Sequence, residues 1–372
     1  MESERLKVGI IGTGMAFERL HYPAYQELAD KYEIVAVCDP DMEKTRRWAA
    51  ELGLGGENIY TDYRPMLWRE DINLFDIMVP IEHNYRVSED VAKAVAHRPG
   101  KAILCEKPMA STYEQAGEFA ELPRRYGIPV MIAENYRYNE EINKIYDLVR
   151  HKKIGEPVYF IQNRVAFFPG DMHKDKFSST EWRRHPVFSG GAILDVAVHD
   201  IAALRHVFGP IDKLQAFGVP QDDDFSPYAV VNVNIRFKSG VTGQFAFYCA
   251  GREAQHPLVG LRIFGTHGMI FLEERDCGTI NVSYNDGNGE QISYRPQRGF
   301  YNELLNLYHS LNGNEAIAVT PEIEYGDVKT VLDILSSIRE ERIIPVDVDE
   351  GKIPAYIPAH QAQFEFHQNQ WH

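Results

Sequence analysis

The segment VGIIGTGMAF, residues 8–17, decides the fold, because it puts two glycines, Gly12 and Gly14, directly after a short apolar run. A dinucleotide-binding turn needs this arrangement: the first glycine permits the tight turn, and the second lets the backbone approach a pyrophosphate. The helix that follows presents its N-terminal amides to the negative charge. We therefore expect a dinucleotide to be held by Gly12, Thr13, Gly14 and Met15.

The end of the next predicted strand supports this interpretation. The segment VAVCDP, residues 35–40, puts Asp39 25 residues beyond Gly14. This is near the separation of roughly 20 residues expected for a ribose-binding carboxylate. Asp39 would accept hydrogen bonds from the adenosine hydroxyls and repel a 2′-phosphate, which favours NAD over NADP. Arg46 and Arg47, on the following predicted helix, leave that choice open. In the alternative interpretation, Asp39 only turns the chain and caps that helix.

Short apolar runs alternate with amphipathic, helix-length segments through the first third of the chain. Strands are predicted at Lys7–Ile11, Glu33–Cys38, Leu74–Val79, Ala102–Cys105 and Val130–Ala133. Helices are predicted at Glu43–Leu52, Val87–Ala96 and Thr112–Tyr126. This alternation is typical of βαβ units and predicts a parallel sheet covered by helices on both faces. We assign residues 1–133 to an α/β dinucleotide-binding domain of the Rossmann type.

The pattern changes from residue 134 onward. Helices are predicted at Glu141–His151, Ala192–Val207, Asn302–Leu311 and Tyr325–Arg339. Strands are predicted at Val158–Phe167, Lys213–Gly218, Ala229–Lys238, Val241–Tyr248, Leu258–Phe264, Met269–Glu273 and Thr279–Ser283. Most of these strands follow one another without an intervening helix, with a turn at Lys238–Gly240, which predicts an antiparallel sheet. We assign residues 134–372 to a second domain of α+β class.

Length and charge exclude several classes of protein. The chain has 372 residues, of which 44% are hydrophobic and 25% charged, so it is globular and long enough for about two domains. Its net charge of −15 disfavours nucleic acid and anionic membranes as partners. No apolar stretch approaches the roughly 18 residues of a membrane span, and the first residues contain no apolar leader.

The cysteines and the tail histidines do not form a metal motif. No C-x-x-C pair occurs among the four cysteines, which are Cys38, Cys105, Cys249 and Cys277. We therefore expect buried thiols in a reducing compartment, hence a cytoplasmic protein without a metal site. The spacing is also irregular among the tail histidines, which are His360, His367 and His372. We expect a solvated or interface-docked tail.

The segment AILCEKPMA, residues 102–110, ends a predicted strand in Glu106, Lys107 and Pro108. Ligands of open parallel sheets bind outside the carboxyl ends of the strands. A lysine there can hydrogen-bond a substrate hydroxyl, while the proline fixes the local backbone. The structural alternative is a surface ion pair between Glu106 and Lys107.

Asp195 and His199 lie four residues apart in SGGAILDVAVHDIAALRHVFG, residues 189–209, which predicts a helix with both side chains on one side. Oxidation of a hydroxyl needs a base, and histidine suits that role because its usual pKa is close to neutral pH. The carboxylate would orient the imidazole or bind a neighbouring substrate hydroxyl. A metal site and a buried polar pair are the alternatives.

Together these segments resemble the Gfo/Idh/MocA family, which includes glucose–fructose oxidoreductase and inositol dehydrogenase. The matching segments are VGIIGTG, AVCDP, YTDYRPML, ILCEKPMA, GEPV, SGGAILDVAVHD and GTHGMIFLE, in the family's order between residues 7 and 273. The resemblance implies a Rossmann domain followed by a domain with a large, open, mainly antiparallel sheet. The exposed face of that sheet is commonly an oligomer interface, so a homodimer or homotetramer is expected.

The resemblance also implies roles for individual residues. The cofactor would be bound by Gly12, Gly14, Asp39, Glu106 and Lys107, with the segment around Pro80 beside the nicotinamide. Catalysis would be carried by Lys107, Asp195 and His199, with His199 as the general base assisted by Lys107.

Two positions depart from the family's pattern. Asn84, which we count among the cofactor-binding residues, stands where relatives often carry a histidine, and His83 lies beside it. Phe17 stands where the glycine motif usually has a small residue, which weakens that match.

A further segment, AENYRYN at residues 133–139, corresponds to one in which relatives often have an Asn-Arg pair. We expect Arg137, together with Trp182 and Arg183, to shape the substrate pocket. Packing within a helix or loop is the alternative for each of them.

We expect an NAD(P)-dependent oxidoreductase that transfers hydride between a nicotinamide cofactor, NAD or NADP, and a secondary hydroxyl of a sugar, inositol or related polyol. Aromatic residues make up 12% of the chain, and several lie between residues 167 and 182, where they could stack on sugar rings. Two alternatives remain within the family. One is an NAD-assisted glycoside hydrolase, and the other is a non-enzymatic, dinucleotide-binding regulator.

Overall fold

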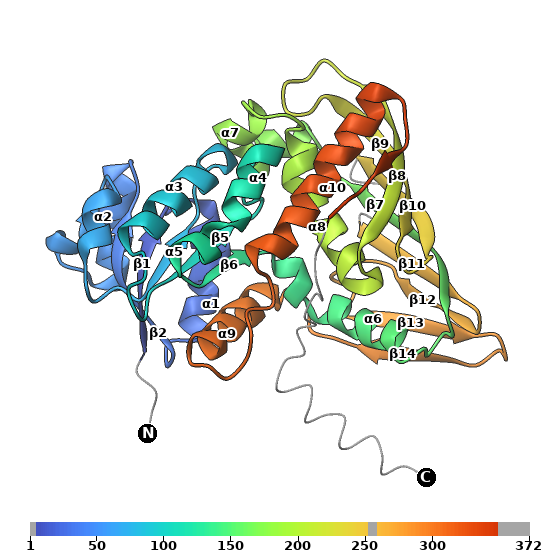
Figure 1. The fold of residues 1–372 in the computed structure, drawn as a ribbon, viewed down its shortest axis with the longest axis horizontal. Coiled ribbons are helices and arrows are strands. Elements are labelled where there is room, and N and C mark those ends of the chain that lie inside the picture. The colour runs from blue at the N-terminus through green and yellow to red at the C-terminus, as the bar shows by residue number, and fades with distance from the viewer. Residues whose placement is uncertain (1–4, 252–258, 349–372) are drawn as a thin grey trace, which may run out of the picture.

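The computed structural model describes residues 5–251 and 259–348 and contains two sheets with helices between them (Figure 1). The first sheet has six parallel strands in the order β3-β2-β1-β4-β5-β6. These strands are β1 (Leu6–Ile11), β2 (Tyr32–Cys38), β3 (Ile59–Tyr60), β4 (Leu74–Ile77), β5 (Ala102–Glu106) and β6 (Val130–Ala133). The strand order reverses between β1 and β4, and a crevice for a dinucleotide forms at such a point.

The predicted parallel sheet is confirmed, and burial explains its composition. Every residue of β4, β5 and β6 is buried, because helices cover both faces of the sheet and each side chain must therefore be apolar or paired. The helices of this half are α1 (Tyr22–Glu27), α2 (Met42–Leu52), α3 (Ile81–Ala94), α4 (Tyr113–Ala120) and α5 (Leu122–Tyr126).

Some element boundaries differ from the prediction. The helix predicted at Thr112–Tyr126 is two helices, α4 and α5, since Pro123 has no amide hydrogen to continue the first one. The helix predicted at Val87–Ala96 begins earlier, at Ile81. A π-helical turn, Phe17–His21, precedes α1. The ring of Phe17 is buried against Trp48, with ring centroids 4.6 Å apart, so this bulky residue points away from the glycine turn.

The second sheet has nine strands in the order β14-β13-β12-β11-β7-β10-β9-β8-β15. They are β7 (Pro157–Val165), β8 (Ile211–Pro220), β9 (Tyr228–Phe237), β10 (Thr242–Tyr248), β11 (Val259–Gly265), β12 (Gly268–Leu272), β13 (Thr279–Tyr284), β14 (Gly289–Ser293) and β15 (Ile344–Pro345). Only the β7–β10 pair is parallel among these strands, so the expected mainly antiparallel sheet is confirmed. The short strands β3, β14 and β15 carry too little apolar pattern to be predicted.

Five further helices belong to the described residues of the second half of the chain. They are α6 (Glu140–Arg150), α7 (Glu181–Arg184), α8 (Ala192–Phe208), α9 (Gly299–Leu311) and α10 (Pro321–Glu340). In Figure 1, α8 and α10 lie between the parallel sheet and the inner face of the nine-stranded sheet. Helix α8 is buried on nearly all sides, which explains why its sequence is apolar throughout rather than on one stripe.

The last two helices also complete the N-terminal sheet. Tyr32 of β2 donates its hydroxyl hydrogen to the carbonyl of Leu304 in α9 at 2.6 Å. The amide of Ile132 in β6 donates to the carbonyl of Val319, just before α10, at 3.0 Å. One side-chain and one backbone hydrogen bond thus join segments that lie far apart in the sequence.

The cysteines follow the prediction with one correction. All four thiols are free; Cys38, Cys105 and Cys249 are buried, but Cys277 is exposed because it lies in the turn between β12 and β13. Among the described residues, no helix is long and apolar enough to cross a membrane. The tail histidines named above lie outside the described residues.

A buried ion cluster ties α10 to both halves of the molecule. Asp327 of α10 accepts two hydrogen bonds of 2.9 Å and one of 3.3 Å from Arg137, which lies in the 3-10 turn after β6. It also accepts one from Arg205 of α8. All three side chains are almost completely buried. Two guanidinium groups therefore share this one carboxylate as a direct ion-pair partner.

We predict that Asp327→Asn lowers the free energy of unfolding by about 3–5 kcal/mol, because it removes the carboxylate charge that pairs with two buried guanidinium groups. Urea unfolding followed by circular dichroism measures this loss. Glu156→Gln is the matched control, since its partner Lys152 forms an exposed pair that contributes little to stability. Equal unfolding midpoints for the two variants would contradict the prediction.

Candidate active site

A cavity of about 1350 Å³ is lined by residues from both halves of the chain. Of the residues singled out from the sequence, it is lined by Gly12, Gly14, Met15, Asp39, Pro80, Glu106, Lys107, Trp182, Arg183, Asp195 and His199. Thr13, Asn84 and Arg137 are not among its lining residues. Among the described residues, no group of three histidine, cysteine or acidic side chains could hold a metal ion.

The glycine turn is shaped for close approach of a ligand. Gly12 has a φ of +99°, and a Cβ atom there would lie 2.2 Å from the carbonyl oxygen of Met78, so no other residue fits. A Cβ atom on Gly14 would meet nothing within 4 Å, because this residue faces the open cavity. The turn therefore fits the pyrophosphate of a dinucleotide, which must approach the backbone closely.

Asp39 is fixed beside this turn by hydrogen bonds. Its Oδ2 accepts from the amide of Thr13 at 2.9 Å and from the hydroxyl of Thr13 at 3.2 Å, and its Oδ1 accepts from the amide of Asp41 at 3.0 Å. The cap of α2 is Asp41, whose side chain accepts from the amides of Glu43 and Lys44. Capping is thus the role of Asp41, and Asp39 borders the cavity. Thr13 acts by holding Asp39.

A buried histidine that the sequence analysis missed anchors the Glu-Lys-Pro turn. His21 lies 2.9 Å from Asp76 Oδ2 through Nδ1 and 3.1 Å from Glu106 Oε1 through Nε2. Burial lowers the pKa of His21, but Asp76 and Glu106 outweigh it and hold this pKa well above its usual value. The other oxygen of Glu106 accepts the amide of Lys107 at 3.0 Å. No sequence pattern around His21 marks this role.

Asn84 also supports this turn. Its side-chain amide donates to the carbonyl oxygens of Glu106 at 3.0 Å and Pro108 at 2.8 Å. Asn84 is fully buried in α3, so it holds the backbone of the turn rather than contacting the cavity. Asn84 was expected to bind the cofactor, and in this structure its side chain contacts the Glu-Lys-Pro turn instead. The Lys107–Pro108 peptide bond in this turn is cis.

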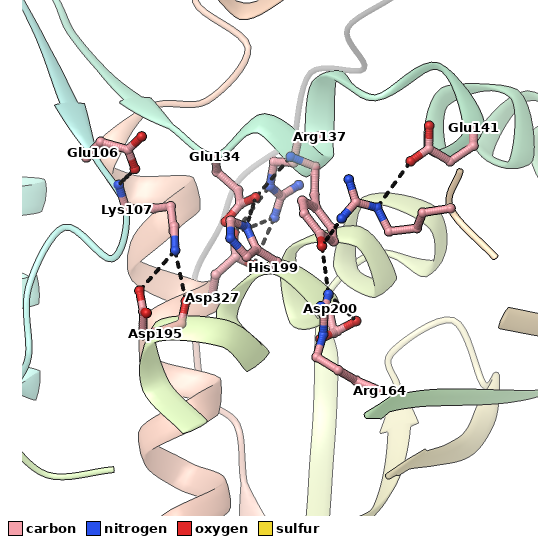
Figure 2. Close-up of polar contacts among 12 residues, drawn as sticks. Glu106, Lys107, Glu134, Arg137, Glu141, Arg164, Asp195, His199, Asp200 and Asp327 are labelled. Carbon is pink, nitrogen blue, oxygen red and sulfur yellow. Dashed lines mark hydrogen bonds and ion pairs between the residues drawn. The ribbon is translucent and has the colours of Figure 1, made fainter. Parts of the chain in front are cut away.

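Lys107 and Asp195 meet across the boundary between the two halves (Figure 2). The ammonium group of Lys107 donates to Asp195 Oδ1 at 3.2 Å and to the Asp195 carbonyl at 2.9 Å. Arg183 donates to Asp195 Oδ2 at 2.7 Å. Burial raises the pKa of Asp195, but the charges of Arg183 and Lys107 outweigh burial and hold this pKa below its usual value. The carboxyl group therefore stays ionised. Asp195 therefore holds two cations at the cavity wall.

His199 is oriented by a different carboxylate from the one expected. Its Nδ1 lies 2.7 Å from Oε1 of Glu134, the residue after β6, and its ring stacks on Tyr136 with centroids 4.2 Å apart. Figure 2 shows Glu134 pointing toward His199 while Asp195 points toward Lys107. The residue that contacts the imidazole is thus Glu134 and not Asp195, for which this was one of two expected roles. The sequence analysis missed Glu134 because its partner is 65 residues away.

Positive charge surrounds the imidazole. Burial, followed by Lys107 and Arg164, lowers the pKa of His199 well below its usual value. Burial raises the pKa of Glu134 to about 7, although Lys107 opposes this shift. At neutral pH the imidazole is uncharged, as a general base requires.

The three residues expected to shape the substrate pocket lie in different places. The guanidinium of Arg183 lies 4.0 Å from the ring centroid of Trp182, and both side chains line the cavity. Arg137 is 2% exposed and binds Asp327, so it belongs to the protein interior rather than to the pocket. An arginine in the turn after β6 is drawn inward by this buried carboxylate.

The fold and the cavity define the class: an NAD-binding oxidoreductase with a Rossmann domain and an α+β domain. A model of an oxidoreductase family with an NAD-binding Rossmann fold matches residues 6–134, and a model of the GFO/IDH/MocA C-terminal domain matches residues 142–271. The chain belongs to the Gfo/Idh/MocA family, as its sequence segments predicted.

Known relatives are moderately similar over most of their length. D-Apiose dehydrogenase of Paraburkholderia graminis is 29% identical over 272 residues, which cover 72% of this chain and 68% of that one. D-Glucoside 3-dehydrogenase of Escherichia coli is 26% identical, covering 79% of this chain and 82% of its own. The solved structure of an Agrobacterium radiobacter oxidoreductase with NAD+, L-tartaric acid and magnesium has a TM-score of 0.80 at 18% identity, covering 92% of this chain and 99% of its own.

We predict that Asp39→Ala raises the dissociation constant for NAD by about 10-fold or more, because a charged hydrogen-bond acceptor for the ribose is removed. The same change should make the dissociation constants for NAD and NADP more similar, since the repulsion of a 2′-phosphate is lost. Titration calorimetry with both dinucleotides measures this. Asp41→Ala is the control: it removes the cap of α2, which affects stability, and should preserve the preference for NAD.

Proposed function

We propose that this protein is an NAD-dependent dehydrogenase that oxidises a secondary hydroxyl of a sugar, inositol or related polyol. One observation carries the proposal: Lys107 and His199, which are 92 positions apart by their residue numbers, border the same cavity as the glycine turn. A general base and a cation beside a dinucleotide site are the groups that hydroxyl oxidation requires.

In the proposed mechanism, NAD held by the glycine turn and Asp39 would supply the acceptor for the hydride. The ammonium group of Lys107 donates a hydrogen bond to the substrate oxygen and stabilises the negative charge that develops there. His199 removes the hydroxyl proton through Nε2, because its Nδ1 is engaged by Glu134. Asp195 keeps Lys107 and Arg183 at the cavity wall through two ion pairs.

The lining of the cavity supports a polyhydroxylated ring as substrate. Trp182, Phe168 and Phe188 offer apolar faces for the C–H side of such a ring, and Arg183 offers hydrogen-bond donors for its hydroxyls. The names of two relatives, D-apiose dehydrogenase and D-glucoside 3-dehydrogenase, point to the same substrate class.

The test is a panel of D-apiose, methyl β-D-glucoside and myo-inositol with NAD and NADP, read by absorbance of the reduced nicotinamide. Lys107→Ala and His199→Ala should each lower turnover by about 100-fold or more while NAD still binds. Near-normal turnover by both variants would refute the assignment. Release of the free sugar from methyl β-D-glucoside without accumulation of NADH would instead indicate a hydrolase.

We further propose that this protein acts in the cytoplasm, as a homodimer or homotetramer formed through the outer face of the nine-stranded sheet. Apolar side chains gather on this face: Phe217 is 62% exposed, and the rings of Tyr159 and Phe264 stack with centroids 5.2 Å apart. Exposed apolar patches of this kind mark association surfaces. The four free thiols fit a reducing compartment.

We predict that Phe217→Glu reduces the molecular mass measured by light scattering, because a buried charge in the interface is unfavourable. Trp68→Glu is the control. This residue is 73% exposed, but it lies in the N-terminal half, away from the nine-stranded sheet. An unchanged mass for Phe217→Glu, with the wild type oligomeric, would assign the interface to another surface.

A further inference from the structure

We propose that Glu134 positions His199 and takes over the proton that His199 removes from the substrate hydroxyl. This inference rests on the proposed function, since it concerns the fate of the proton in the same oxidation. His199 would then pass the proton on rather than keep it. Glu134 is a positioning residue in this scheme, because it acts on the substrate only through the imidazole.

The geometry fixes the imidazole on its edge and on one face. Oε1 of Glu134 accepts the amide of Tyr136 at 3.0 Å and lies 2.7 Å from Nδ1 of His199, so an ionised Glu134 accepts the Nδ1 hydrogen. The stacked ring of Tyr136 is itself held by Arg164 and Arg275, which both donate to its hydroxyl oxygen. His199 lines the cavity, and with Nδ1 engaged its Nε2 is the nitrogen left for the substrate. Figure 2 shows this line from Glu134 to His199.

Charged groups face the pair from every element packed against it. The cations are Lys107 after β5, Arg137 in the turn after β6, Arg164 in β7 and Arg275 after β12. The carboxylates are Glu106 in β5, Asp195 in α8, Glu303 in α9 and Glu324 in α10. Behind Arg164 and Arg275 lie their partners, Asp200 and Glu141.

Burial shifts the pKa values of the two members of the pair in opposite directions, because it disfavours the charged form of each. Burial and then Lys107, Arg164 and Arg275 disfavour an imidazolium ion, so the pKa of His199 is well below its usual value. Glu134 has a fully buried side chain, and burial raises its pKa to about 7. A proton on the pair is therefore more stable on Glu134. In serine-protease triads the order is reversed and the carboxylate stays ionised.

The proton transfer balances as follows. The substrate O–H bond breaks as the Nε2–H bond of His199 forms, while the Nδ1–H bond breaks as the Oε1–H bond of Glu134 forms. The hydride leaves the same carbon for the nicotinamide. The products are a carbonyl group, a neutral imidazole with its hydrogen on Nε2, and a protonated Glu134. Oxidation therefore needs Glu134 ionised, so its rate should rise with pH through about 7, and the reverse reduction should fall.

A substrate-free experiment tests the pair directly. In ¹⁵N NMR spectra of histidine-labelled protein, the His199 signals are those missing from His199→Asn. Above pH 7 the hydrogen should reside on Nδ1, and as the pH falls from about 8 to about 5 it should move to Nε2, because protonated Glu134 then donates to Nδ1. Glu134→Gln should abolish this tautomer switch. A wild-type tautomer that is constant over the range, or an imidazolium ion at its lower end, would overturn the proposal.

Kinetics give the second test, with the sugar from the panel that turns over. Glu134→Gln should lower the turnover number by about 100-fold and remove the rise in oxidation rate near pH 7, whereas Glu134→Asp should keep that rise. NAD affinity and the melting temperature should stay near those of the wild type, which shows that the variant is folded. A role limited to structure would lower the rate equally at all pH values.

Glu141→Gln is the matched comparison, because burial also raises the pKa of Glu141 to about 7. Glu141 forms an ion pair with Arg275, whereas Glu134 contacts His199 directly. The rise near pH 7 should persist in Glu141→Gln. If it persists in Glu134→Gln and is lost in Glu141→Gln, the proton relay is refuted while the proposed function stands. Activity of His199→Ala and Lys107→Ala would refute the proposed function instead.

Discussion

The ion pair between Lys107 and Asp195 is the contact on which the architecture of the cavity depends. It joins the end of a parallel strand to the first turn of a buried helix in the other half of the molecule, and Arg183 binds the same carboxylate. A largely buried carboxylate such as that of Asp195 would be costly without both cations. The two halves therefore close on each other at the point where a hydroxyl group would be oxidised, and the wall of the cavity carries fixed charge there.

The sequence predicts what is encoded locally. Gly12, Gly14 and Asp39 follow strands directly, so their position at the carboxyl edge of the sheet can be inferred from spacing alone. The i, i+4 spacing of Asp195 and His199 likewise predicts one helix side, and both residues line the cavity. The boundary between residues 133 and 134 stays a prediction. The break before α5 was not predicted, because it is marked by Pro123 and not by the periodicity of apolar residues.

What the sequence did not predict are the partners of these residues. Glu134 and His21 are single polar residues without a motif, and each acquires its role from a neighbour far along the chain. Arg137 and Asn84 were expected at the cavity, but buried partners, Asp327 and the carbonyls of the Glu-Lys-Pro turn, hold them in the interior. Buried polar groups pair with whatever the tertiary structure brings near, and that information is absent from local spacing.

The completion of the N-terminal sheet by the last two helices has a consequence for biosynthesis. The first 133 residues emerge from the ribosome before α9 and α10 have been synthesised. Until those helices emerge, the hydroxyl of Tyr32 and the amide of Ile132 lack the carbonyl groups that they bind in the finished molecule. The Rossmann half can therefore reach its fully native state only after α9 and α10 have been synthesised. Its folding cannot be completed when its own residues have been translated.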